Sequence, residues 1–176
     1  MTREEAYFRK LLLLTGYDDP ERKWLMQLLE AEPLEDVALE LAWAGDDPKA
    51  LFSCLNAYAP QKAVDSAQVF DLAWRELRNR FRAGEMDAPQ CMRAMAALAQ
   101  ASGFSLEEPW QTAGLFYDNY QEALAGYFSM EQVTDGFRRF MEDGARPENP
   151  WFSAEPAQPK ARKSLRAHLR RILHRD

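Results

Sequence analysis

Histidine is almost absent from this chain. Of its 176 residues only His168 and His174 carry an imidazole, and both lie within the last nine positions. Imidazole is the one side chain whose ordinary pKa makes it a ready proton donor and acceptor near neutral pH. Without it, residues 1–167 lack Ser–His and Cys–His nucleophile pairs, histidine-ligated zinc and most general acid–base arrangements. We therefore expect a protein that is not an enzyme and that uses neither a metal nor a cofactor.

Cysteine and long apolar runs are also scarce. Cys54 and Cys91 each lie in an apolar stretch with helical spacing, where a free thiol behaves as a small apolar side chain. No run approaches the ~18 apolar residues that a membrane span requires. The first residues do not have the layout of a signal peptide, because acidic side chains precede a short apolar run. These features predict a cytoplasmic protein in a reducing compartment.

The charges divide the chain into two parts. Apolar residues make up 47% of the sequence, which is ample for a core. Residues 1–152 carry 26 acidic and 15 basic side chains, for a net charge of −11, whereas residues 153–176 carry two acidic and seven basic ones, for a net charge of +5. An acidic body repels nucleic acid and favours a basic partner.

Signals for helix starts and stops recur along the chain, whereas alternating β-branched strands bounded by hairpin signals are absent. We therefore expect an all-α fold, with a single compact domain of about eight helices over residues 1–144. A partial repeat of Gly16–Pro20 at Gly45–Pro48 leaves open a stacking of helical hairpins. The expected starts are Thr2, Asp19, Pro33, Asp47, Asp65 or Ser66, Asp87, Ser105 (with Glu108 as a capping box) and Ser129.

Residues 145–176 differ from the rest. Four prolines interrupt the segment 147–159, which is typical of a linker. The basic stretch beyond it has the spacing of a short amphipathic helix over 164–173. This tail fits a phosphate backbone, an anionic lipid surface or the acidic body of the same chain, and its sequence does not choose among them.

The densest acidic segment is residues 18–47, with ten carboxylates against Arg22 and Lys23. Helix capping accounts for some of these carboxylates but not for the excess. Two explanations of the excess stay open: plain solvation of the surface, or a partner surface whose field would steer a basic partner and raise its association rate. On the helix expected between Ser105 and Gly126, Leu115, Phe116 and Tyr120 fit a core face. Tyr117 falls off that face, where it either covers a neighbouring helix or is exposed as an interface anchor. The candidate partner-binding residues are Asp18, Asp19, Glu32, Glu35, Asp36, Glu40, Trp43, Asp46, Asp47 and Tyr117.

The remaining enzymatic alternative is a carboxylate metal site. Asp118 and Glu122 stand four residues apart, on one face of a helix. No calcium-loop pattern accompanies them, and no second helix supplies the Glu-x-x-His of a di-iron site, so the spacing favours a solvated acidic face over a metal site.

Two stretches resemble a known class of proteins. Residues 34–55 (LEDVALELAWAGDDPKALFSCL) look like a segment of small helical proteins found at bacterial polymorphic-toxin loci, and residues 110–126 and 129–132 are similar to their C-terminal half. The resemblance covers about residues 5–143 and implies an immunity protein that binds and neutralises one cognate toxin, for example a nuclease with a basic cleft. It assigns no binding residues. The alternative is a regulatory or adaptor module whose basic tail binds nucleic acid or membrane.

Overall fold

The computed structural model describes residues 1–19 and 21–143, and these residues form helices and loops without a strand. The expected all-α fold is confirmed. The proline-rich linker, the basic tail and its amphipathic helix lie outside the described residues. The helices are α1 (Arg3–Thr15), α2 (Lys23–Leu29), α3 (Asp36–Ala44), α4 (Pro48–Tyr58), α5 (Ser66–Arg82), α6 (Ala88–Ser102), α7 (Trp110–Leu124) and α8 (Met130–Asp143), with a 3-10 turn, η1 (Gln61–Ala63), before α5.

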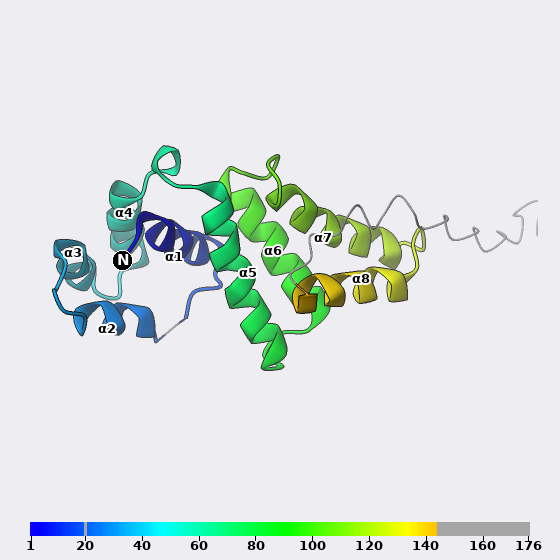
Figure 1. Cartoon of the computed structure of the whole chain (residues 1–176), viewed down its shortest axis with the longest axis horizontal. Coiled ribbons are helices and arrows are strands. Elements are labelled where there is room, and N and C mark those ends of the chain that lie inside the picture. Colours follow the sequence, from blue (N-terminus) through cyan, green and yellow to red (C-terminus); the bar gives the residue numbers. More distant parts are fainter. Residues whose placement is uncertain (20, 144–176) are drawn as a thin grey trace, which may run out of the picture.

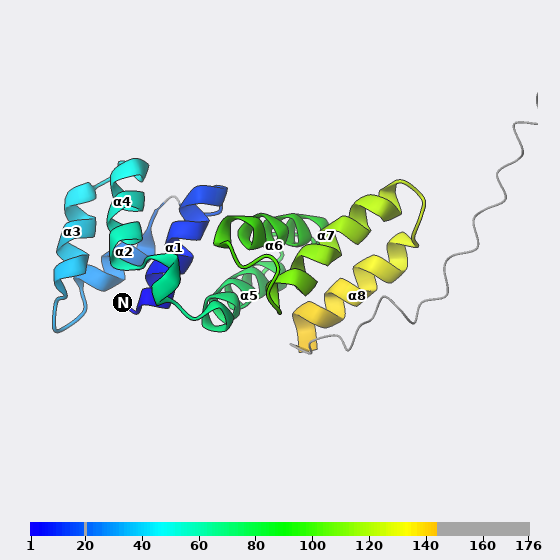
Figure 2. The same ribbon diagram turned by 90° about the horizontal axis from the view of Figure 1, so that it is seen from above.

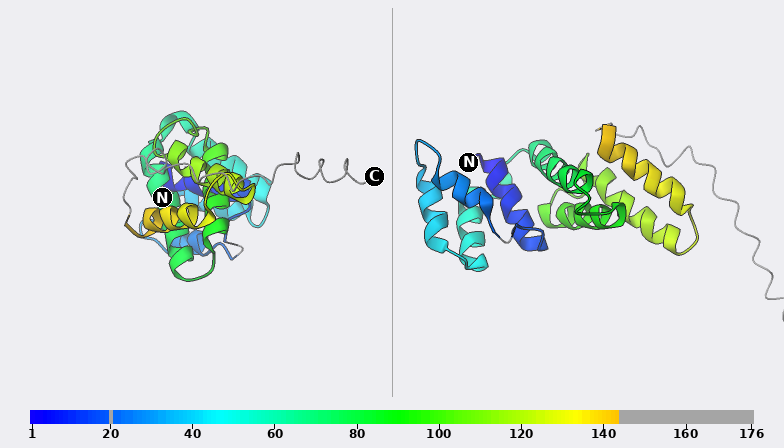
Figure 3. Two further views of the ribbon diagram at one scale, coloured as in Figure 1. Left: turned by 90° about the vertical axis from the view of Figure 1, so that its right-hand side faces the viewer. Right: turned by 90° about the horizontal axis from the view of Figure 1, so that it is seen from below.

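The helices follow one another along an elongated body (Figure 1, Figure 2). α2, α3 and α4 form one end, α7 and α8 form the other, and α1, α5 and α6 lie between them. Figure 3 shows the same order from below, with α3 and α4 far from α8. Consecutive helices pack as pairs, α3 with α4, α5 with α6 and α7 with α8. One continuous cluster of buried apolar side chains draws on all eight helices, so the described residues form a single domain.

α6 is the centre of this core. It contacts α1, α5, α7 and α8, and nine of its fifteen residues are buried. Several of these are alanines, whose small side chains let neighbouring helices approach closely. The Tyr7 hydroxyl of α1 donates a 2.7 Å hydrogen bond to the carbonyl of Ser102 at the end of α6. The central helix is therefore held by both apolar contacts and a buried polar one.

Most expected helix starts are confirmed. Thr2 and Glu5 form a reciprocal capping box at α1, and Asp87 and Gln90 form another at α6. Side-chain oxygens of Asp47, Asp65 and Ser129 accept hydrogen bonds from backbone amides in the first turns of α4, α5 and α8. Each side chain satisfies an amide that has no partner within its helix.

Three expected starts are wrong. α2 begins at Lys23 rather than beside Asp19, because Arg22 adopts a left-handed conformation (φ 47°) that a helix interior excludes. α3 begins at Asp36 rather than Pro33, after an extended Glu35. α7 begins at Trp110 rather than after Ser105. The Glu108 carboxylate accepts from the Thr112 hydroxyl instead of closing a capping box.

Cys91 is fully buried beneath α5, and burial, followed by the charge of Asp87, raises the pKa of its thiol to about 11. Because the thiolate is the reactive form, we expect iodoacetamide to leave Cys91 unmodified in the folded protein at about pH 8 and to label it in concentrated guanidinium chloride. Half-exposed Cys54 is the internal comparison. Mass spectrometry of the labelled peptides measures this, and rapid native labelling of Cys91 would contradict the packing of α6.

Candidate partner-binding face

α3 buries one side and exposes the other. Val37, Ala38 and Leu41 are buried, where α3 packs against α2 and α4. On the opposite side the sequence places Asp36, Leu39, Glu40 and Trp43 at intervals of three and four residues, so their side chains share one surface. All four are exposed, and we refer to them as the α3 face.

Trp43 is the most unusual residue of this face. Its side chain is 86% exposed, and its neighbour one turn earlier, Leu39, is 40% exposed. The other tryptophans of the described residues are buried or half-buried. An indole this exposed contributes little burial to folding, and tryptophan is among the residues most enriched at the centres of protein interfaces. Trp43 therefore lies outside the core, with its indole accessible from solvent.

The acidic side chains around Trp43 are mostly without counter-ions. Residues 30–47 contain seven carboxylates and no lysine or arginine. Two of them are paired: Glu35 with the Met1 ammonium at 2.8 Å, and Asp46 with Arg22 at 3.2 Å. Among the described residues, no cation forms an ion pair with the other five, which are Glu30, Glu32, Asp36, Glu40 and Asp47. Their unneutralised charge produces a negative potential over the α3 face.

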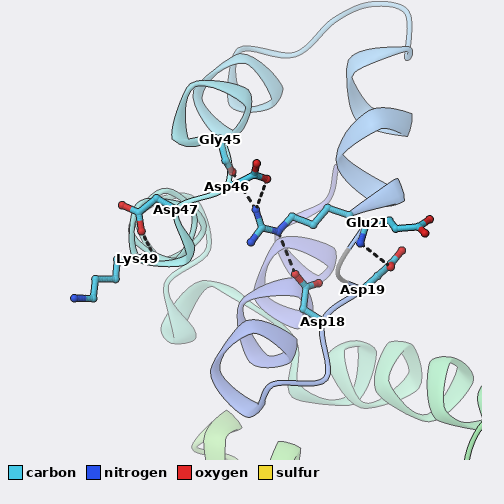
Figure 4. Close-up of polar contacts among 8 residues, drawn as sticks. Asp18, Asp19, Glu21, Gly45, Asp46, Asp47 and Lys49 are labelled. Carbon is cyan, nitrogen blue, oxygen red and sulfur yellow. Dashed lines mark hydrogen bonds and ion pairs between the residues drawn. The ribbon is translucent and has the colours of Figure 1, made fainter.

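A separate group of charges holds the loops beside α3 in place. The Arg22 guanidinium donates to the Gly45 carbonyl at 3.1 Å and to Asp46 at 3.2 Å, and its Nε lies 3.6 Å from an Asp18 oxygen (Figure 4). The α1–α2 and α3–α4 loops are thereby joined through one side chain. The left-handed backbone of Arg22 directs that side chain into this junction. The arrangement fixes α3 relative to α1.

The junction gives Asp18 a structural position. Its side chain is only 12% exposed, and burial raises the pKa of its carboxyl, while Trp24, Arg22 and Arg9 act in the opposite direction. Asp19 is half-buried and accepts a 3.0 Å hydrogen bond from the amide of Glu21. Asp46 and Asp47 lie at the surface on the loop that follows α3. Of the candidate carboxylates, Asp18 is thus the one placed inside the protein.

Tyr117 lies apart from the other candidates. It is half-buried on α7, at the opposite end of the molecule from α3 (Figure 1). Its ring stacks on Tyr120 with centroids 6.4 Å apart, and both rings pack against the core. Leu115, expected in the core, is instead 43% exposed, because the buried stripe of α7 runs through Trp110, Ala113 and Phe116. The structure does not bring Tyr117 to the α3 face.

Sequence reasoning identified Trp43 but missed the exposed leucines near it. Leu34, just before α3, is 46% exposed, and Leu39 is 40% exposed. The spacing of Leu39 four residues before Trp43 was an available signal for a shared exposed side. Only the packing of α2 and α4 decides which side of α3 is covered.

The described residues contain neither a cluster of metal-ligating side chains nor a membrane-crossing helix. No group of three or more histidine, cysteine, aspartate or glutamate side chains lies close enough to hold a metal ion there, including around Asp118 and Glu122. Within the same residues, none of the helices has the length and apolar character needed to cross a bilayer.

Comparison with protein-family models, with curated proteins and with solved structures finds no match for the chain. The resemblance to immunity proteins therefore stays a prediction.

Proposed function

We propose that this protein acts by binding a basic protein partner on the α3 face, and that it is an immunity protein that neutralises a cognate bacterial toxin. The observation that carries the proposal is the solvated indole of Trp43 on a helix whose other exposed polar side chains are carboxylates without counter-ions. An aromatic anchor supplies affinity, and the surrounding charge supplies orientation and a fast encounter.

This arrangement suits inhibition of a toxin by filling or covering its substrate-binding cleft. A toxin that cleaves nucleic acid needs a basic cleft to hold its substrate. A rigid surface of fixed carboxylates can fill such a cleft or cover its entrance without performing any chemistry. The α3–α4 pair and the Arg22 junction supply the rigidity, because both flanks of α3 are tied to neighbouring elements. The positive charge of such a cleft would complement the negative charge of the α3 face.

The direct test is co-expression of the full chain with the toxin encoded by the adjacent gene. We expect a complex that elutes as one species in gel filtration and restores growth of cells that produce the toxin. Toxicity that persists, together with separate elution of the two proteins, would contradict the proposal.

A tail-neutralised variant separates this function from nucleic-acid or membrane binding through the tail. In it, glutamine replaces Lys160, Arg162, Lys163, Arg166, Arg170 and Arg171 in the full chain. We expect it to protect cells as the natural chain does. Loss of protection would favour the tail as the binding element.

A further inference from the structure

A partly open cavity of about 290 Å³ lies between α1, α2 and α5. Its apolar lining includes Phe8 of α1, Trp24 and Leu28 of α2, and Leu72 of α5. Small-molecule sites in proteins commonly measure about 300–1,000 Å³ and combine apolar walls with a few polar groups. This cavity has the size for a small ligand with an apolar body.

Arg9 is the polar group that stands out in the cavity. Its guanidinium carbon lies 5.6 Å from the ring centroid of Phe8 and 5.6 Å from that of Trp24. The side chain is half-buried, yet it forms no hydrogen bond or ion pair with any residue that the structure describes. Burial lowers the pKa of Arg9, against the opposing charges of Glu76, Asp18 and Glu5. A partly desolvated guanidinium with unused donors is costly, and an acceptor would relieve that cost.

The other charged groups of the cavity already have partners. Glu76 accepts from Arg80 at 2.8 Å, and Glu5 accepts from the Thr2 amide at 2.8 Å. Arg75 donates through Nε to the Asp71 carbonyl at 3.2 Å. Among the charged side chains that line the cavity, Arg9 is therefore the one without a hydrogen bond or ion pair to a described residue, and a matching ligand brings an anionic acceptor. A planar guanidinium pairs with a carboxylate through two parallel hydrogen bonds.

We propose that this cavity binds a small carboxylate with an aromatic or short aliphatic body. The carboxylate lies against Arg9, and the apolar body lies against Trp24, Leu28 and Leu72. The site is separate from the α3 face, so it does not depend on the function proposed above.

The test uses the full chain and two probes of almost equal shape, phenylacetate and its neutral analogue phenylacetamide. We expect saturable binding of phenylacetate by calorimetry, with a change in tryptophan fluorescence because Trp24 lines the site, and about tenfold weaker binding of phenylacetamide or none. Arg9→Met keeps the aliphatic stem and removes the charge. We expect it to lower phenylacetate affinity at least about tenfold.

Arg93→Met is the matched control, since Arg93 is exposed on α6 and does not line the cavity. It should bind phenylacetate as the natural chain does. Leu28→Trp fills the cavity while keeping Arg9, and it should also abolish binding, so the test survives an Arg9→Met chain that does not fold. Equal binding of the two probes, unchanged binding by Arg9→Met or by Leu28→Trp, or loss of binding in Arg93→Met would overturn the proposal.

A second pair of probes identifies the source of the carboxylate. A short peptide ending in phenylalanine is compared in its free and C-terminally amidated forms. Binding of the free form alone, without binding of phenylacetate, would assign the site to the carboxyl terminus of a polypeptide. Absence of binding by every carboxylate probe overturns the inference, and it leaves partner binding at the α3 face untouched.

Discussion

Replacing Glu32, Asp36 and Glu40 by lysine should slow association with a basic partner about a hundredfold at low ionic strength. These carboxylates are exposed and form no ion pair within the described residues, so their charge acts on an approaching molecule. Glu35 is left in place, because its carboxylate holds the Met1 ammonium. Stopped-flow association rates at several salt concentrations measure the effect, which should shrink as the Debye length falls.

The matched control changes the same amount of charge at the other end of the molecule. Lysines at Asp118 and Glu122 of α7 and Glu131 of α8 also take the formal net charge from −6 to 0. All three carboxylates are exposed and unpaired within the described residues. We expect this variant to associate much faster than the α3 variant. Equal slowing would show that overall charge, rather than the α3 face, steers the partner.

The helices that the sequence predicted well begin with strong local signals. Thr2, Asp47, Asp65, Asp87 and Ser129 each supply a side-chain oxygen to an amide in the first turn. That interaction spans two or three residues, so it is readable without any knowledge of the rest of the fold.

The start expected at Asp19 failed because of distant partners. Asp19 offered an equally good capping signal, but Arg22 leaves the helical conformation to reach Gly45 and Asp46, more than twenty residues away. The contacts of Arg22 with Gly45 and Asp46 join the α1–α2 loop to the α3–α4 loop. A local pattern contains no information about such a contact.

The candidate site also has features that the local sequence predicts and others that depend on distant contacts. The spacing of Asp36, Glu40 and Trp43 indicates that they share a side of a helix, which the structure bears out. Whether that side faces solvent depends on where α4 packs, and Asp18 is enclosed by residues of other elements. Sequence therefore identified a charged segment, and only the fold separates its surface carboxylates from its structural one.

Trp43→Ala should weaken partner binding about thirtyfold or more while leaving the melting temperature almost unchanged. The binding loss corresponds to the roughly 2 kcal/mol that defines a central interface residue. The stability of the free protein should change by no more than about 0.5 kcal/mol, because the indole is 86% exposed and contributes little to the core. Calorimetric titration with the partner and thermal unfolding of the same samples measure the two quantities.

Phe137→Ala should have the opposite effect to Trp43→Ala, because it should lower stability and leave partner binding unchanged. Phe137 is fully buried on α8, and its ring centroid lies 5.3 Å from that of Phe116 and 6.1 Å from that of Phe140. Removing it leaves a cavity that should cost about 3–5 kcal/mol and lower the melting temperature by about 10 °C. Well below that temperature, affinity should be retained, since α8 and α3 lie at opposite ends (Figure 2). If Trp43→Ala lowered stability and spared binding instead, Trp43 would be a structural residue and the α3 face would have no anchor.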